Sequence, residues 1–204
     1  MKLIHTKSNE TLLKEIPSIP FHDLSIVFYL FLDKDEHGQM TVLIRNDHLP
    51  IWNTDTSELY KLAIDNTPRL YPPCIRSMAS LINDMLFVNG TLIQPSFAAA
   101  SPNALDLTDT PIPLSILTNT SGIFGASAML YPGVLKEFSK KIGHDLIILP
   151  SSVHEVLLLP YDSTYSFQEI ADMVKDVNEK CVPVEEQLSN QVYYCLLYTS
   201  DAAD

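Results

Sequence analysis

The sequence predicts an α+β fold in which an antiparallel sheet of hairpins carries helices packed on one side. Short apolar segments occur in pairs separated by a few turn residues, which is typical of antiparallel hairpins. Other segments repeat apolar residues every three or four positions after capping residues, as amphipathic helices do. Because strand pairs with short connections recur along the chain, an antiparallel sheet is favoured over a parallel one.

Three strand pairs make up the predicted sheet. Each pair places two runs rich in β-branched, aromatic or leucine side chains around a short turn. The predicted strands are Leu24–Leu32, Met40–Ile44, Leu114–Thr118, Phe124–Leu130, Asp145–Leu149 and Val153–Leu159. Asn119–Gly122 is then a hairpin turn; the alternative, a backbone anion cradle, lacks the spacing of a phosphate loop. The small residues of Gly125–Ala128 predict a strand that a helix approaches closely.

Five segments have helical periodicity. Asp55 and Glu58, and again Ser166 and Glu169, have the spacing of a capping box, so we expect a helix to begin at each pair. The other predicted helices cover 8–16, 77–86 and 132–143. The last helix is expected to bury Ile170, Met173, Val174 and Val177.

Length and composition indicate one domain. The chain has 204 residues, of which 46% are hydrophobic and 19% charged, as in ordinary globular proteins. We expect a single, incomplete α+β domain over 1–194. Within it, segment 88–111 is rich in Asn, Gly, Pro, Ser, Thr and Ala and has no periodicity, which predicts a surface loop or insertion.

Charge and cysteine content restrict the partners. A net charge of −12 repels phosphate groups, so we expect neither a nucleic-acid nor a membrane partner, while a protein partner is compatible. The N-terminal residues lack the apolar region of a signal peptide, and we expect a cytoplasmic protein. Cys74 and Cys181 stand alone and the six histidines show no metal-ligand spacing, so we expect neither a metal nor a cofactor.

The last ten residues, 195–204, read CLLYTSDAAD. One frame of the transposon-end adapter used in sequencing libraries encodes them in this order. We therefore expect a non-native tail from adapter translated at the end of a metagenomic fragment, with natural sequence ending near Tyr194. Since such a tail was not selected to fit the core, we expect it to pack on nothing.

Six stretches of the chain together carry a family resemblance. They are LLKEIPSIPFHDLSIVFYLFL (12–32), TVLIRNDHLPIW (41–52), LYKLAIDNTPRLYP (59–72), ILTNTSGIFGASAMLYPGVLKEF (116–138), DLIILPSSVHEVLLLP (145–160) and VNEKCVPVEEQLSNQVY (177–193). With them the chain resembles a bacterial family, domain of unknown function 5688 (DUF5688). The resemblance implies sequence upstream of Met1 and variable length at 88–111. It implies no activity, cofactor or catalytic residue.

Two short stretches contain the residue types of a catalytic site. Asp47 and His48 could orient each other, and Ser152 and His154 could form a dyad if both point to one face of a strand. In each case the alternative is local: Ser, Asn and Asp side chains commonly hydrogen-bond the backbone of a turn. If Val153–Leu159 is extended, the neighbouring Glu155 points to the opposite face and cannot serve His154.

Two functional hypotheses follow from these residues. The first is a non-catalytic binding or regulatory interaction domain, which we favour because the polar residues are few and lie mainly at turns. The second is a hydrolase with a polar site near Ser152 and His154, completed by His48 and Asp47. A pocket that gathers these four side chains would support the enzyme.

Overall fold

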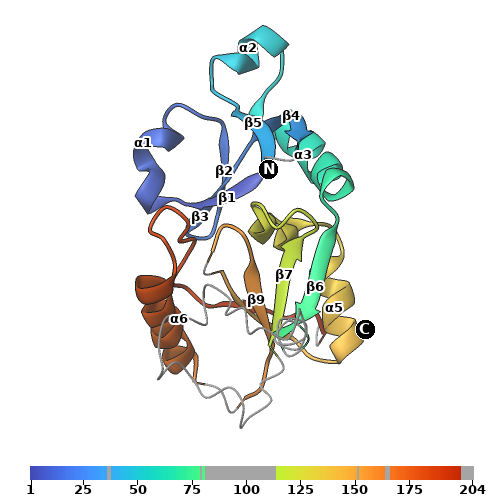
Figure 1. Ribbon diagram of the computed structural model, residues 1–204, viewed down its shortest axis with the longest axis vertical. Helices are drawn as coiled ribbons and strands as arrows, with labels where there is room; N and C mark the ends of the chain where they lie inside the picture. Colours follow the sequence, from blue (N-terminus) through green and yellow to red (C-terminus); the bar gives the residue numbers. More distant parts are fainter. Residues whose placement is uncertain (36–37, 79, 81–113, 151, 164–165, 199–204) are drawn as a thin grey trace.

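The computed structural model describes residues 1–35, 38–78, 80, 114–150, 152–163 and 166–198. Its strands form three antiparallel sheets (Figure 1). They are β1 (Lys2–His5), β2 (Ser18–Phe21), β3 (Leu24–Val27), β4 (Tyr29–Asp35), β5 (Gly38–Leu43), β6 (Pro73–Ser77), β7 (Ser115–Asn119), β8 (Leu146–Leu149), β9 (Val156–Pro160) and β10 (Tyr193–Cys195). The helices are η1 (Lys7–Asn9), α1 (Glu10–Leu13), α2 (His48–Trp52), α3 (Thr56–Leu70), η3 (Gly125–Leu130), α5 (Val134–Ile142) and α6 (Phe167–Cys181).

The N-terminal part of the chain contains the two smaller sheets. One has the strand order β1-β3-β2, and the other is the two-stranded ribbon β4-β5. A single apolar run, predicted as the strand Leu24–Leu32, supplies β3 to the first and β4 to the second. The run is divided at Phe28, which is buried and whose carbonyl accepts the amide of Ile44. Splitting the run lets its two halves pair with different partners.

The five-stranded sheet, of order β10-β8-β9-β7-β6, is covered on both faces. Leu146 and Ile148 of β8 belong to a core that also receives the apolar side of α5. The alternate residues Ile147 and Leu149 belong to a second core with Ile170 and Val174 of α6. Since successive side chains of a strand point to opposite faces, α5 and α6 lie on opposite sides of the sheet, and Figure 1 shows them on opposite flanks.

The predicted α+β class with antiparallel sheets is confirmed, and its arrangement differs in two respects. The strands form three sheets rather than one, and helices cover both faces of the largest sheet rather than one side. The division of the apolar run at Phe28 separates the two smaller sheets from each other. All four residues of β8 are apolar and buried, which is the pattern of a strand covered on both faces.

The predicted strand Phe124–Leu130 is wrong, because Gly125–Leu130 forms the 3₁₀ helix η3. A hairpin partner for β7 would need a free edge, but β6 occupies one edge of β7 and β9 the other. The chain therefore turns at Phe124, which has a left-handed backbone (φ 53°), and packs its small residues against the sheet. The close approach predicted for these small residues does occur.

The capped helices are confirmed at their starts. Asp55 accepts the amide of Glu58 at 2.8 Å before α3, and Ser166 accepts the amide of Glu169 at 3.4 Å before α6. The inward face of α6 differs from the prediction, because Met173 and its neighbour Val177 are more than a third exposed. The third buried position is instead taken by a polar residue, Asn178.

Three predicted segments lie wholly or partly outside the described residues. The helix 77–86, except at its start, and the loop 88–111 lie outside the described residues. The prediction that 195–204 packs on nothing is wrong at its beginning: Cys195 ends β10 and pairs with Leu146, and the amide of Tyr198 donates to Asp145 Oδ1 at 2.8 Å. An open strand edge offers backbone groups that pair with any extended segment, whatever its side chains. Residues 199–204 lie outside the described part.

Within the described residues, no helix combines the length and the apolar character that crossing a membrane requires.

Candidate functional site

A cavity of about 440 Å³ lies between the β4-β5 ribbon, α3 and the loop that follows β7. This volume falls within the range of small-molecule sites. Its apolar lining consists of Phe28, Leu30, Phe31, Ile44, Leu59, Leu62, Ala63, Leu70, Ile123 and Phe124, together with Met1. Its polar lining consists of Tyr29, Thr41, Asn66, Thr67, Tyr71, Asn119 and Ser127. The walls therefore come from three separate parts of the chain.

The loop after β7 holds one end of the cavity by its own hydrogen bonds. Asn119, which is 4% exposed, donates from its amide to the carbonyl of Ile123 at 3.0 Å and accepts the amide of Ser121 at 3.0 Å. The hydroxyl of Ser127 donates to the carbonyl of Phe124 at 2.9 Å. These contacts fix the loop before any ligand arrives, so this end of the cavity is preformed.

A buried phenol stands behind that polar end. Tyr131 is 3% exposed, and its hydroxyl has no hydrogen-bond partner among the described residues. Burial raises the pKa of this phenol, and the nearby side chains of Ser127 and Asn119 oppose the rise. A phenol hydroxyl can donate one hydrogen bond and accept another, so this group adds to the polar character of that end.

The structure does not bring the predicted catalytic residues together. His48 lies on α2, at one end of the molecule in Figure 1, where its Nδ1 accepts the amide of Arg45 at 3.2 Å. Its Nε2 lies 3.9 Å from Oδ1 of the largely exposed Asp47, and its ring contacts Trp52. β9, which follows His154, lies in the opposite half. His48 and Asp47 are thus a local pair beside a short helix.

Ser152 and His154 are close in space, but their side chains do not pair. The hydroxyl of Ser152 accepts the backbone amide of His154 at 3.0 Å, as serine does in a turn. The ring of His154 instead accepts the amide of Phe124 at Nδ1 (3.4 Å) and places Nε2 3.6 Å from Oε1 of Glu186. β9 begins only at Val156, so the expected strand alternation does not include these residues.

A charged cluster surrounds the ring of Phe124 on the side of His154. The two rings stack with centroids 6.1 Å apart, and Lys2 Nζ lies 4.3 Å from the centroid of Phe124. Burial raises the pKa of the Glu155 carboxyl, which Glu186 raises further and His154 opposes. Neither His154 nor Glu155 belongs to the described lining of the cavity. The contact of this cluster with the cavity is indirect, through the amide and the ring of Phe124, which His154 contacts.

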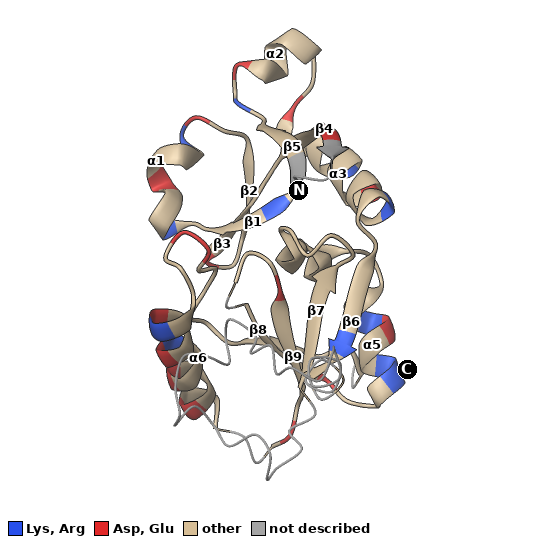
Figure 2. Cartoon of the chain, viewed as in Figure 1, with Lys and Arg blue, Asp and Glu red and all other residues tan. Residues whose placement is uncertain are grey.

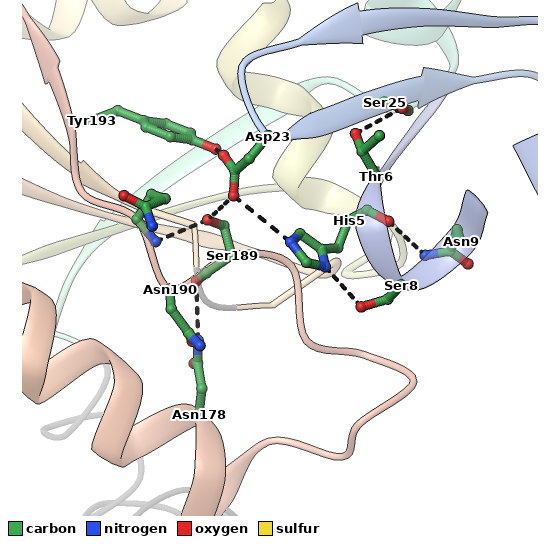
Figure 3. Close-up of polar contacts among 11 residues, drawn as sticks. His5, Thr6, Ser8, Asn9, Asp23, Ser25, Asn178, Ser189, Asn190 and Tyr193 are labelled. Carbon is green, nitrogen blue, oxygen red and sulfur yellow. Dashed lines mark hydrogen bonds and ion pairs between the residues drawn. The ribbon is translucent and has the colours of Figure 1, made fainter.

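A second polar cluster joins the first sheet to the segment that follows α6 (Figure 3). Asp23, in the turn between β2 and β3, accepts hydrogen bonds from Ser189 Oγ at 2.6 Å and from the Tyr193 hydroxyl at 2.5 Å. The ring of His22 stacks on Tyr193 with centroids 4.9 Å apart. Asn178 of α6 donates to the carbonyl of Ser189 at 3.0 Å. The carboxylate of Asp23 thereby ties the first sheet to the segment after α6.

The same cluster contains a serine, a histidine and an aspartate, but not in catalytic geometry. His5 Nδ1 lies 2.7 Å from Ser8 Oγ, whereas its Nε2 lies 3.9 Å from Asp23 Oδ2, beyond hydrogen-bond distance. Both oxygens of Asp23 already accept hydroxyl groups. Because these residues lie outside the cavity as well, we interpret the cluster as a structural clasp.

The clasp predicts how stability changes at alkaline pH. Burial raises the pKa of the Tyr193 phenol above its usual 10, and the Asp23 carboxylate raises it further. Above pH 10 the unfolded chain loses this proton while the folded chain keeps it, so stability falls as pH rises. We expect the stability advantage of the wild type over Tyr193→Phe to shrink between pH 8.5 and 11, measured by urea denaturation. An advantage that stays constant over this range would contradict the assignment.

A larger cavity, of about 860 Å³, lies between α5 and the end of β6. Its lining includes Ser80 and Ser115. These two serines flank segment 81–113 in the sequence, which lies outside the described residues. No group of three or more metal-ligating side chains occurs in the part of the chain that the structure describes.

The fold and the smaller cavity define an α+β domain with a preformed, mostly apolar pocket. The family model DUF5688, a family of unknown function, matches residues 1–196, and the chain belongs to this family. No curated protein and no solved structure shows a significant match to the chain.

The cavity was not predicted from the sequence. Its residues read as ordinary core and turn positions, since the segment after Asp55 is predicted from the sequence only as a capped helix. One signal was available in the sequence. The apolar run continues without a break from β3 into β4, although β4 belongs to a ribbon of only two strands, where such residues need a further partner to cover them.

Proposed function

We propose that this chain is a non-catalytic binding domain whose site is the cavity between the β4-β5 ribbon, α3 and the loop after β7. One observation carries the proposal: a cavity of about 440 Å³ has apolar walls and a fixed polar end. Sites of this kind, with hydrophobic walls and few convergent polar groups, bind small molecules.

Exposed apolar side chains at the cavity support this proposal. Leu62 and Leu70 of α3 are 54% and 55% exposed, and Leu30 of the ribbon is 39% exposed, although all three line the cavity. Grouped exposed apolar residues commonly mark binding sites, whereas single ones carry no such meaning. A ligand in the cavity would cover them.

The alternative, a hydrolase at Ser152 and His154, has weaker support. The Ser152 hydroxyl is used by a backbone amide, and the His154 ring contacts Phe124 and Glu186 instead of the hydroxyl. A nucleophile needs a base within hydrogen-bond reach and a substrate position beside it. His48 and Asp47 stand in the other half of the molecule and supply neither.

Filling the cavity tests the proposal directly. Ala63 lines the cavity from α3, so Ala63→Phe places a ring in the space that a ligand would use. We expect this variant to bind the uncharged fluorescent dye N-phenyl-1-naphthylamine at least tenfold more weakly, a loss of about 1.4 kcal/mol. Binding is measured by fluorescence titration, with circular dichroism to confirm the fold.

Lys61→Phe is the matched control. Lys61 is exposed on the same helix outside the described lining, so this variant adds the same ring without filling the cavity, and its dye affinity should stay within twofold of the wild type. If Ala63→Phe does not fold, Leu62→Trp blocks the cavity from an exposed position. Equal dye affinity in the cavity variant and in Lys61→Phe would exclude this cavity as the site.

A further inference from the structure

We infer that the ligand of this cavity is an uncharged, mostly apolar molecule with one or two hydrogen-bonding groups. The inference rests on the proposed function and adds the chemical class of the ligand. Its basis is the lining: no charged side chain of the described residues borders the cavity.

The remaining polar groups of the cavity are neutral. Burial raises the pKa of the Tyr29 and Tyr71 phenols, so both stay protonated at neutral pH. Met1 also lines the cavity, and its backbone nitrogen donates to Thr67 Oγ1 at 3.1 Å. A carboxylate or ammonium bound here would lose its hydration without gaining an ion partner.

The charged side chains of the described residues do not line the cavity. Figure 2 shows Lys, Arg, Asp and Glu on α5 and α6 and also on α3, but none of the charged residues of α3 belongs to the described lining. Lys2 Nζ lies 4.3 Å from the ring centroid of Phe124, and the negative charge of Glu186 acts on this cation. Lys2 does not line the cavity. An anionic ligand would therefore meet no cationic side chain in the described lining.

The polar end of the cavity selects a hydrogen-bonding group. Asn119 and Ser127 line it, and the hydroxyl of Tyr131, which lacks a partner, lies behind them. Since the lining offers both hydroxyl and amide groups, a neutral alcohol or amide can donate and accept there without changing the charge of the site. The apolar body of the ligand then lies between α3 and the β4-β5 ribbon.

Three naphthalenes of one ring size and different charge test the inference. 1-Naphthalenemethanol is neutral, 1-naphthylmethylamine is a cation and 1-naphthoic acid is an anion at pH 7.5. Each is used to displace N-phenyl-1-naphthylamine from the full chain. We expect the alcohol to bind at least tenfold more tightly than either ion, and about threefold more tightly than 1-methylnaphthalene, which lacks the hydroxyl.

The paired ions separate the lining from the net charge of the protein. General repulsion by a charge of −12 would weaken the anion but strengthen the cation, whereas an uncharged lining weakens both. If either ion binds as tightly as the alcohol and Ala63→Phe abolishes that binding, the uncharged class is wrong while the cavity remains the site. If Ala63→Phe leaves dye binding intact, the proposed function fails and the inference fails with it.

Discussion

Replacing Gly125 by alanine is expected to destabilise this protein by about 3 kcal/mol or more, enough to unfold a domain of ordinary stability under mild conditions. A Cβ at this position would lie 2.8 Å from the amide nitrogen of Asn119, and closer still to Thr118 Oγ1 and the carbonyl of His154. Two of these three atoms belong to backbone, which cannot move aside as a flexible side chain can. The substitution would also disturb the hydrogen bond from Thr118 to His154.

Gly122 is the matched control for this effect. Its backbone is left-handed (φ 69°), but an added Cβ meets nothing within 4 Å. Gly122→Ala should therefore cost only the backbone term, about 1 kcal/mol. Both variants are compared with the wild type by urea denaturation. If Gly125→Ala is no more costly than Gly122→Ala, the close packing of η3 against β7 is not a source of stability.

Local elements of this fold are predictable because their signals are local. The helices α3 and α6 begin with a side chain that caps an amide three residues on. Although α5 begins at Val134 rather than at Pro132, it ends at Gly143 as predicted. These features depend on neighbours in the sequence, and tertiary contacts did not change them.

Elements that depend on distant partners were missed or misassigned. β6 is a strand only because it pairs with β7, and its start at Pro73 looks like a break in the chain. Once β6 and β9 occupy both edges of β7, Gly125–Leu130 has no edge to join and becomes a 3₁₀ helix. The choice between strand and helix for that segment was thus made by Pro73–Ser77, about fifty residues earlier in the chain.

The candidate site was unpredictable for a related reason. Its polar end comes from the loop after β7, and its walls come from α3 and from a ribbon that stands apart from both larger sheets. Each residue has an ordinary local role: Asn119 holds a turn, Ser127 donates to the carbonyl of Phe124 and Ala63 lies on a helix face. Only their meeting in space makes a cavity. By contrast, Ser152 and His154 can be recognised as candidate catalytic residues from the sequence, because only Val153 separates them.

Removing the Asp23 carboxylate should also have a large effect, because this group accepts two hydrogen bonds from residues more than 160 positions away in the chain. Asp23→Ala leaves the hydroxyls of Ser189 and Tyr193 without their acceptor. Hydrogen bonds to a charged group contribute about 1.5–3 kcal/mol each, and the partial exposure of Asp23 lowers this value. We expect a loss of about 2–3 kcal/mol in the free energy of unfolding.

A local readout distinguishes the clasp from a general loss of stability. The amide of Gln191 donates to Ser189 Oγ, and Asn178 holds the carbonyl of Ser189 to α6, so the segment 189–193 is ordered through the same hydroxyl that Asp23 binds. In Asp23→Ala, hydrogen exchange should therefore accelerate at 189–195 more than in α3, which contributes none of the residues labelled in Figure 3. Asp23→Asn, which retains one acceptor oxygen, should lose about half as much stability. An exchange rate at 189–195 that matches the wild type would show that Tyr193 and its neighbours are held by stacking on His22 and by β8 pairing, without the carboxylate.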